Sequence, residues 1–459
     1  MSVFSLSNLK KTWYYLQKNG IRNAVWAVLE RIGQEQEVYT WQEPDEKTLS
    51  FQREHSASLR ISIVVPAYRT KKEHLEAMLN SVSKQSYPHW ELIVADAGGT
   101  AESVQAWAKK NGICLRKAAD TSNLAEWKDQ SIMLCTLSEN KGISANTNAG
   151  IELAAGDAVG LLDHDDLLTA NALWEMADCL EKEKKRGKQK LVLFSDEDKC
   201  DGAASRFSEP NFKPDFDGEL LLTNNYICHF TVIETAFLKE LKLRSGFDGA
   251  QDYDLMLRAY AAGGQFVHVP KVLYHWRCHE ASTASNPQSK RYAYEAGQRA
   301  LEDYCLRKGW KATVSGLKHL GFYREDYEDS VFCQRPEIGI WAKPLPGGRD
   351  IFGIRHPKGF LVSGLYENDG LMRYAGLRKG YSGPMHRAAL QQSAPAADLR
   401  SMEVCSALKE RYAQTIAELK EACQGLPTAA QETKILQKSM EFCKEATAAG
   451  YGILWDPQA

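Results

Sequence analysis

The chain has 459 residues, with 57 Lys and Arg against 59 Asp and Glu, a formal net charge of −2, and 44% hydrophobic residues. This length suits two or three domains, and the near-neutral charge excludes the basic field of a nucleic-acid-binding protein. Eleven scattered cysteines without a CxxC pair exclude a disulfide framework or a zinc ribbon and favour a reducing cytoplasm. We find no signal-peptide core and no apolar run of about 20 residues, so we expect a cytoplasmic protein.

The first segment, residues 1–58, is predicted to be helical and then a linker. LKKTWYYLQKNG and IRNAVWAVLERI give two short helices around Asn19-Gly20, with apolar and basic side chains at helical spacing. Residues 1–50 could lie on the inner face of the cell membrane as an amphipathic anchor. Alternatively, they form a hairpin that packs on the main domain or on a second subunit of a homodimer, which we favour. The polar residues 42–58 are the predicted linker.

From Arg60 onward, predicted strands and helices alternate on short connections. Strands are expected at ISIVVPA, WELIVADAGG, SIMLCTL, DAVGLLDHDD and KLVLFSDEDK. The helices between them are expected at KKEHLEAMLNSVSKQ, AESVQAWAKKNG, SANTNAGIELAAGD, which Gly156 would close, and TANALWEMADCLEKEKK. This alternation predicts an α/β domain with a mainly parallel sheet flanked by helices.

Acidic residues follow three of the predicted strands, at the strand ends where ligands bind in such sheets. They are Asp96, then Asp163, Asp165 and Asp166, then Asp196, Glu197 and Asp198. One acidic strand end is usually a helix N-cap, whereas three at one edge indicate a shared polar cleft. In extended chain Asp163 and Asp165 point to the same side, so both can face one Mn²⁺ or Mg²⁺ ion. Such an ion would neutralise a diphosphate leaving group.

These motifs occur in the order found in a known family. SIVVPAYR, ELIVADAGG, ENKGISANTNAGIELAAGD, LLDHDD, SDEDK, GAQDYDLMLR and VLYHWRCHEASTA together resemble the family 2 glycosyltransferases, which have the GT-A fold. The resemblance covers Ser62 to Arg299, and it is to bacterial rhamnosyltransferase-like enzymes of cell-surface polysaccharide synthesis. It implies an inverting, metal-dependent transfer of a sugar from a UDP- or dTDP-sugar to a hydroxyl of a glycan or lipid-linked acceptor.

The resemblance also implies roles for individual residues. The nucleotide sugar would be bound by Pro66, Ala67, Tyr68, Asp96, Asn140, Lys141, Gly142, Asp163 and Arg277, the last with His279. Asp96 would accept a hydrogen bond from the pyrimidine imide, and Lys141 would contact phosphate. An ordinary Asn-Lys-Gly turn is the alternative for residues 140–142. The metal ligands would be Asp163, Asp165 and His275.

A transferase of this kind also needs a general base and an acceptor site. The resemblance implies that Asp252 in GFDGAQDYDLMLR is the base, with Asp254 as the alternative. These aspartates could instead only complement the helix dipole, without a catalytic role. The acceptor side is expected to include Asp196, Glu197, Asp198, Asn225 and Trp276. Trp276 or Tyr226 could stack on a sugar ring or belong to the core.

The last third of the chain is predicted to be a truncated second unit. EFCKEATAAGYGILWDP aligns without gaps to DLMLRAYAAGGQFVHVP, and both end in an apolar strand and a proline. Because this part has no DxD and no QDYD, we expect a degenerate transferase-like domain at 326–459 after a catalytic domain at 59–325. It would bind acceptor, dimerise or contact a partner enzyme.

Two other functions remain open from the sequence. A nucleotidyltransferase would need a Gly-rich, basic phosphate loop after the first strand, and VVPAYRTKKEH is only a modest version of one. A catalytically inactive glycan-binding or scaffolding member of a polysaccharide-synthesis complex would keep the metal motif as a relic.

Overall fold

The computed structural model describes residues 39–118, 128–278, 291–316, 320–342, 372–373 and 402–422, with residues 438, 441–442, 445–446 and 448–455. The helices predicted before residue 39 lie outside this part, as does His279. The chain divides into residues 1–40 and a second unit from residue 41 onward, to which the elements below belong. Among the described helices, none has both the length and the apolar character needed to cross a membrane.

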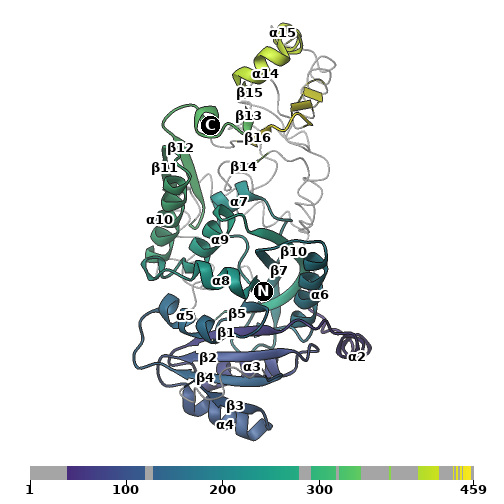
Figure 1. The fold of residues 1–459 in the computed structure, drawn as a ribbon, viewed down its shortest axis with the longest axis vertical. Helices are drawn as coiled ribbons and strands as arrows, with labels where there is room; N and C mark the ends of the chain where they lie inside the picture. Colours follow the sequence, from purple (N-terminus) through teal and green to yellow (C-terminus); the bar gives the residue numbers. More distant parts are fainter. Residues whose placement is uncertain are drawn as a thin grey trace, which may run out of the picture. The chain divides into compact units, whose positions relative to one another are not determined.

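A ten-stranded sheet is the centre of the described structure (Figure 1). Its order is β3-β4-β2-β1-β5-β9-β7-β10-β6, with β8 paired to β7. The strands are β1 Ile61–Ala67, β2 Trp90–Asp96, β3 Cys114–Lys117, β4 Ser131–Thr136, β5 Ala158–Leu161, β6 Leu167–Leu168, β7 Leu191–Cys200, β8 Phe207–Asn211, β9 Thr231–Glu234 and β10 Gln265–Arg277.

The direction of the strands brings the predicted acidic segments to one edge. β1 pairs in parallel with β2 and β5, β2 with β4, and β4 with β3. β9 is antiparallel to both β5 and β7, so β7, and with it the parallel β10, runs the same way as β1. The predicted fold class, a mainly parallel sheet flanked by helices, is therefore confirmed. The carboxyl ends of these parallel strands share one edge.

Both faces of the sheet are covered because apolar residues occupy both sides of its strands. Ile61, Ile63 and Val65 of β1 point into one core, while Val64 points into the other, as the two-residue period requires. The first core is covered by α3 Lys72–Ser83, α4 Ala101–Asn111 and α6 Ala172–Lys185. The second is covered by α5 Ile143–Leu153, α7 Gly218–Thr223, α8 Thr235–Leu241, α9 Gln251–Ala261 and α10 Arg291–Arg307.

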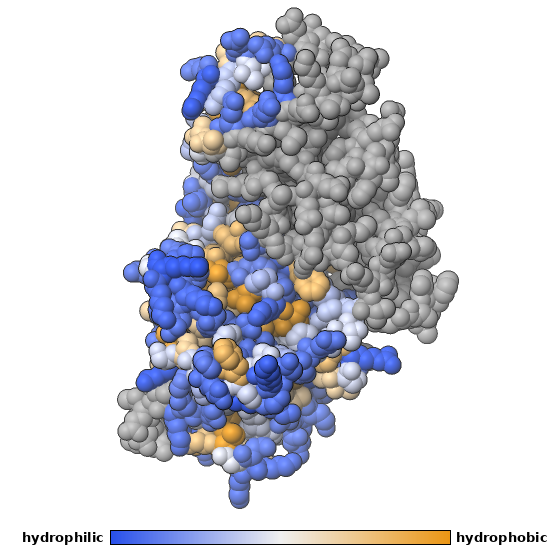
Figure 2. Space-filling model, turned by 90° about the vertical axis from the view of Figure 1, so that its right-hand side faces the viewer, coloured by the Kyte–Doolittle hydropathy of each residue, from blue (hydrophilic) through white to orange (hydrophobic). Residues whose placement is uncertain are grey.

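Most of the described surface seen in Figure 2 is hydrophilic, and apolar side chains gather in one area near the middle of that face. Large exposed hydrophobic residues among those described are few: Phe51, Tyr68, Tyr292 and Leu306. The apolar residues of the strands and helices are thus used mainly for the two cores.

The predicted linker at residues 42–58 contains a helix, α2 Glu46–Glu54, so that prediction was wrong. Asp45 caps it by accepting a hydrogen bond from the Thr48 amide at 2.7 Å. The helix buries Leu49 and Gln52, and the Gln52 side-chain oxygen accepts a 2.7 Å hydrogen bond from the Ser86 hydroxyl. Because this helix buries only two residues, its sequence is mostly polar and lacks the apolar periodicity that would predict a helix.

The end of one predicted helix and one predicted domain boundary differ from those in the structure. The helix expected to close at Gly156 ends at Leu153. Gly156 instead lies against β1, where a Cβ would come within 2.7 Å of the Arg60 carbonyl oxygen. The expected domain boundary at 325/326 falls inside β12 Tyr323–Tyr327, which pairs with β11 Ala312–Gly316.

A second sheet, from the C-terminal part, has the order β14-β16-β13-β15. Its strands are β13 Ile338–Ala342, β14 Met372–Arg373, β15 Met402–Val404 and β16 Gly452–Trp455, with helices α11 Val331–Gln334, α14 Ser406–Arg411 and α15 Ala413–Ala422 nearby in sequence. β13 lies between an antiparallel β15 and a parallel β16. β7 likewise lies between the antiparallel β9 and the parallel β10.

Three consecutive residues of the central strand pair in the same way in these two groups of three strands, although β13 has a register shift against β16 just before them. Val192 of β7 pairs with Ile233 and Phe266, and the next two residues of β7 continue both ladders. Ile340 of β13 pairs with Val404 and Ile453, and its next two residues also continue both ladders. Ile453 is the residue that the sequence alignment sets opposite Phe266.

The helix ends that precede β10 and β16 match as well. The Ala262 and Gly264 amides donate to the Arg258 and Ala259 carbonyls at 2.9 and 2.8 Å. The aligned Ala449 and Tyr451 amides donate to the Glu445 and Ala446 carbonyls at 2.9 and 3.1 Å. Gly263 and Gly450 occupy the left-handed region at φ 77° and 90°, as helix C-caps do.

Candidate active site

The acidic motif after β5 forms a tight turn that β10 holds in place. The Asp166 amide donates to the Asp163 carbonyl at 3.3 Å. The Asp166 carboxylate is buried and accepts hydrogen bonds from the Tyr274 hydroxyl at 2.6 Å and the Arg277 amide at 2.7 Å. Asp166 therefore fixes the turn, which leaves Asp163 and Asp165 as the candidate ligands of a cation.

Arg277 also supports this turn. Its Nε donates to the Asp165 carbonyl at 2.5 Å and its Nη1 to the Gly202 carbonyl at 2.7 Å, and the residue is 2% exposed. Its buried Nη2 has no hydrogen-bond partner among the described residues. The diphosphate contact predicted for Arg277 would therefore have to use Nη2.

Charges gather around Asp163. Burial raises the pKa of the Asp163 carboxyl, and the neighbouring Asp165 and Asp252 carboxylates shift it in the same direction, while His229 opposes them. Burial likewise raises the pKa of Asp166 well above its usual range, with Asp163 and Asp165 adding to the effect. Carboxylates so close together ionise more easily when a cation lies among them.

The carboxylate oxygens of Asp163 and Asp165 suit a hard divalent cation, but His275 is not grouped with these two residues. No three His, Cys, Asp or Glu side chains within the described ranges are grouped so that they could hold a metal ion. The His275 Nδ1 lies 2.5 Å from the Asp198 Oδ1, and its ring packs against Trp41 and Phe207. Mg²⁺ or Mn²⁺ needs only one or two protein carboxylates when water and phosphate complete its shell, so the two aspartates fit.

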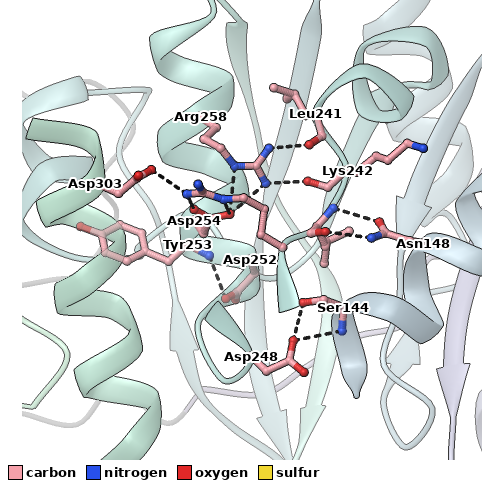
Figure 3. A network of polar contacts seen from close by, with 12 residues as sticks. Ser144, Asn148, Leu241, Lys242, Asp248, Asp252, Tyr253, Asp254, Arg258 and Asp303 are labelled. Atoms are coloured by element: carbon pink, nitrogen blue, oxygen red, sulfur yellow. Dashed lines mark hydrogen bonds and ion pairs between the residues drawn. The ribbon is translucent and has the colours of Figure 1, made fainter. Parts of the chain in front are cut away.

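The start of α9 presents two aspartates in different surroundings (Figure 3). Asp252 is half-buried, and its Oδ2 accepts a 2.9 Å hydrogen bond from the Asn225 side chain. Asp254 is 1% exposed and forms ion pairs with Arg244 and Arg258. Because its charge is used inside the protein, Asp254 is unsuited to take a proton from substrate. Asp252 is thus the better candidate base.

The Asp254 network fixes the position of α9. The Arg258 guanidinium donates to the Leu241 and Lys242 carbonyls at 2.6 and 2.5 Å, at the end of α8. Arg244 joins Asp254 to Asp303 of α10, with 2.7 Å between its Nη2 and the Asp303 Oδ2. The i, i+4 spacing of Asp254 and Arg258 places both on one helix face.

The predicted nucleotide segment at the start of α5 is a closed turn. The Asn140 side-chain oxygen accepts hydrogen bonds from the Gly142 amide at 3.1 Å and the Asn146 side chain at 2.8 Å. Gly142 has φ 94°, which favours glycine. Lys141 is exposed and lies 3.2 Å from Glu139, a surface pair that leaves its ammonium able to reach an anion.

The carboxyl ends of β1 and β2 lie side by side, with Ala67 paired to Asp96. The Asp96 carboxylate accepts hydrogen bonds from the amides of Gly98 at 3.1 Å and Ala101 at 2.9 Å, so it also caps α4. Tyr68 is 40% exposed beside this turn. The nucleotide roles of Pro66, Ala67, Tyr68 and Asp96 stay predictions, placed at the same sheet edge as Asp163.

The acidic segment expected to face the acceptor is buried instead. Asp196, Glu197 and Asp198 lie within β7, which continues to Cys200 because β8 and β10 both pair with it. They are 2%, 6% and 0% exposed. Their carboxylates contact His268, Lys213 and His275, respectively. These pairs support the sheet, and the expected acceptor contact of the three carboxylates is corrected accordingly.

His229 is a site residue that sequence reasoning did not single out. Its ring stacks on Tyr274, with centroids 5.1 Å apart, and meets Trp276 edge-on at 5.8 Å. Its charge also shifts the pKa of Asp163 downward. It lies in NNYICHF, the segment before β9 that the sequence places on the acceptor side together with Asn225.

Residues 62–241 match the family model described as Glycosyl transferase family 2. The chain carries a family 2 glycosyltransferase domain. The match runs from β1 to the end of α8, so it includes the DxD turn and stops before α9 and Asp252. The family 2 domain predicted from the ordered motifs is therefore confirmed.

Relatives of this glycosyltransferase domain are bacterial. The chain is 36% identical over 255 residues to an uncharacterised protein, y4gI, of Sinorhizobium fredii, covering 55% of the chain and 26% of that protein. It is 34% identical over 256 residues to the O-antigen biosynthesis protein RfbC of Myxococcus xanthus, covering 56% of the chain and 19% of RfbC. The matches thus span about a quarter and a fifth of the lengths of these two relatives.

A shorter relative is covered more fully. The amylovoran biosynthesis glycosyltransferase AmsB of Erwinia amylovora is 28% identical over 232 residues, which cover 47% of the chain and 70% of AmsB. Among solved structures, S. aureus TarS in complex with UDP is similar over 54% of this chain and 66% of that chain, with 19% identity and a TM-score of 0.39.

Replacing Asp254 by Asn should destabilise the family 2 domain. The substitution leaves Arg258 without its buried counter-charge and Arg244 with only Asp303, so the free energy of unfolding should fall by about 3 kcal/mol. Asp252→Asn removes no ion pair and should cost at most about 1 kcal/mol. Urea denaturation measures both. Equal losses for the two variants would contradict the different roles assigned to these aspartates.

Proposed function

We propose that the protein is an inverting, metal-dependent glycosyltransferase. It would move a sugar from a UDP- or dTDP-sugar to a hydroxyl of a cell-surface polysaccharide or a lipid-linked glycan. The observation that carries this proposal is the convergence of a cation-binding turn and a candidate base, since Asp252 acts electrostatically on Asp163. The names of RfbC and AmsB, which concern surface polysaccharides, favour this substrate class.

The donor would bind along the edge formed by β1, β2 and the start of α5. Tyr68 and Asp96 would contact the base, and Lys141 and the Arg277 Nη2 would contact the diphosphate. Asp163 and Asp165 would hold Mn²⁺ or Mg²⁺, which would neutralise charge on the diphosphate when bound. The phosphate contacts would orient the anomeric carbon toward α9.

Asp252 would act on the acceptor. As the acceptor oxygen attacks the anomeric carbon, its proton passes to the Asp252 carboxylate and the bond from that carbon to the diphosphate oxygen breaks. Direct displacement inverts the configuration and needs no covalent enzyme intermediate. The hydrogen bond from Asn225 would fix the orientation of the Asp252 carboxylate.

The place of action would be the cytoplasm. All nine cysteines within the described ranges are free thiols, which suits a reducing compartment. Membrane contact through residues 1–50 and homodimer formation stay predictions. The alternative is an inactive scaffold. An enzyme would release UDP or dTDP when acceptor is added, whereas a scaffold would not.

We also propose that the sheet of β13, β15 and β16 is an incomplete copy of the acceptor half of the catalytic domain. Its support is the shared strand register and the matching helix ends described above. When the alignment is extended by two residues toward the N-terminus, Ser439 stands opposite Asp252, so the proposed copy would lack the base. No second DxD occurs in its sequence.

Asp252→Asn should abolish transfer while leaving nucleotide binding intact. Loss of a general base should lower the rate of nucleotide release by about 100- to 10,000-fold. Release is measured with UDP- and dTDP-sugars, and UDP affinity by isothermal titration calorimetry. Asp326→Asn, an exposed carboxylate of β12, is the control and should behave as wild type. Near-normal turnover of Asp252→Asn would refute the base assignment.

Removal of divalent ions should stop the reaction, and Mn²⁺ should restore it. Asp165→Asn should weaken Mn²⁺ binding by about tenfold or more, because one of only two carboxylate ligands is lost. Electron paramagnetic resonance of free Mn²⁺ measures binding without an activity assay. Asp178→Asn, which removes an exposed helical ion pair with Lys182, should leave the affinity unchanged. Equal Mn²⁺ affinity in wild type and Asp165→Asn would refute the metal assignment.

The incomplete copy predicts that each chain binds a single nucleotide. Titration of the full chain with UDP in the presence of Mn²⁺ should therefore saturate at equimolar nucleotide, and Asp163→Asn should weaken that binding event. A second, unaffected binding event would show that the C-terminal part retains a nucleotide site.

A further inference from the structure

A buried lysine lies beside the acceptor side of the proposed site. Lys213, between β8 and α7, is 1% exposed. Its ammonium lies 2.8 Å from the Ile227 carbonyl oxygen, 2.6 Å from the His229 carbonyl oxygen and 2.5 Å from the Glu197 Oε2. The ammonium therefore donates to two carbonyls and forms an ion pair with Glu197.

The contacts of Lys213 join two separate parts of the fold. Glu197 and Asp196 are consecutive residues of the central strand β7. Glu197 contacts the Lys213 ammonium, and the Asp196 Oδ1 accepts a 2.8 Å hydrogen bond from the Lys213 amide. His268 of β10 holds Asp196 in place at 2.9 Å. The lysine is therefore anchored on the rigid sheet at two adjacent positions.

The other two contacts reach the segment that joins α7 to β9, residues 224–230. This segment carries both Asn225, which donates to Asp252, and His229, which packs on Tyr274 and Trp276. Its Ile227 and His229 carbonyls would lose their contact with a buried cation if Lys213 were shortened or made apolar. Buried carbonyls without a donor are costly, so the segment would rearrange.

Stability alone does not account for a charge in this place. Taking an ammonium and a carboxylate out of water costs several kcal/mol, and an apolar replacement of a buried pair is often neutral. The pair instead fixes positions. Glu197 of β7 holds the ammonium, which donates to two specific carbonyls and so sets their place relative to that strand.

We propose that Lys213 is a positioning residue for the acceptor side of the site. It would hold residues 225–229 so that Asn225 orients the Asp252 carboxylate and His229, with Trp276, forms a wall for the acceptor sugar. This inference rests on the proposed function. Lys213 contacts none of the residues assigned to the donor edge, so its loss should affect the acceptor and not the nucleotide.

The test compares Lys213→Met with Lys239→Met. Lys239 is a matched control, because its ammonium also donates to two carbonyls, those of Glu152 and Ala154, but it packs α8 against α5. Activity is nucleotide release from UDP- and dTDP-sugars with a panel of octyl glycosides, using the pair that gives the fastest release with wild type. Hydrogen exchange is measured for residues 225–229 and 96–101.

For Lys213→Met we expect kcat to fall about 100-fold and the acceptor KM to rise about tenfold, as misplaced groups cause. The Kd for UDP should stay within about threefold of wild type, and exchange should quicken at 225–229 but not at 96–101. Lys239→Met should change neither the acceptor KM nor exchange at 225–229.

Glu197→Gln is a milder second variant that keeps the volume and removes the counter-charge. It should shift the acceptor KM and the exchange of 225–229 in the same direction but by less, and it supports the test if Lys213→Met does not fold. An unchanged acceptor KM in a folded Lys213→Met or Glu197→Gln variant would refute the positioning role. Absence of nucleotide release by wild type would instead refute the proposed function.

Discussion

The structure depends on how it accommodates many carboxylates at one edge of a parallel sheet. Buried charges of one sign repel unless each has a donor or a cation. Asp166 is satisfied by Tyr274 and the Arg277 amide, and Asp96 by the amides that begin α4. The pKa of Asp163 is raised by its burial and by the nearby carboxylates of Asp165 and Asp252. That imbalance is what a divalent cation would relieve.

The two halves of the proposed reaction are carried by different parts of the sheet. The donor half uses β1, β2, β5 and α5, where parallel strands end together. The acceptor half begins beyond β9, whose reversed direction connects β5 to β7. Its geometry depends on buried ion pairs: Asp254 with Arg244 and Arg258 places α9, and Lys213 with Glu197 places residues 224–230. The base thus sits where two such pairs bring their elements together.

The C-terminal sheet has a strand arrangement like that of the acceptor side, which supports the proposed incomplete copy. Over three consecutive residues, β13 pairs with an antiparallel β15 and a parallel β16 as β7 pairs with β9 and β10. The β13–β16 ladder differs in having a register shift between Ile338 and Ile340. The proposed base, Asp252, has no counterpart in this part of the sequence.

The sequence alone determined the α/β architecture and the acidic residues that follow β5, because hydrophobic periodicity and strand-end acids are local signals. The base on α9 came from the family resemblance and stays a prediction. The resemblance favoured Asp252 over Asp254, but only the structure supplied a physical reason, the ion pairs of Asp254. The sequence did not indicate that Asp196, Glu197 and Asp198 are buried, because their burial depends on β8 and on β10, which pairs with β7 from far along the chain. It also missed α2 and Lys213. Only the tertiary structure assigned partners to these groups, since an ion pair between residues distant in sequence leaves no periodic pattern.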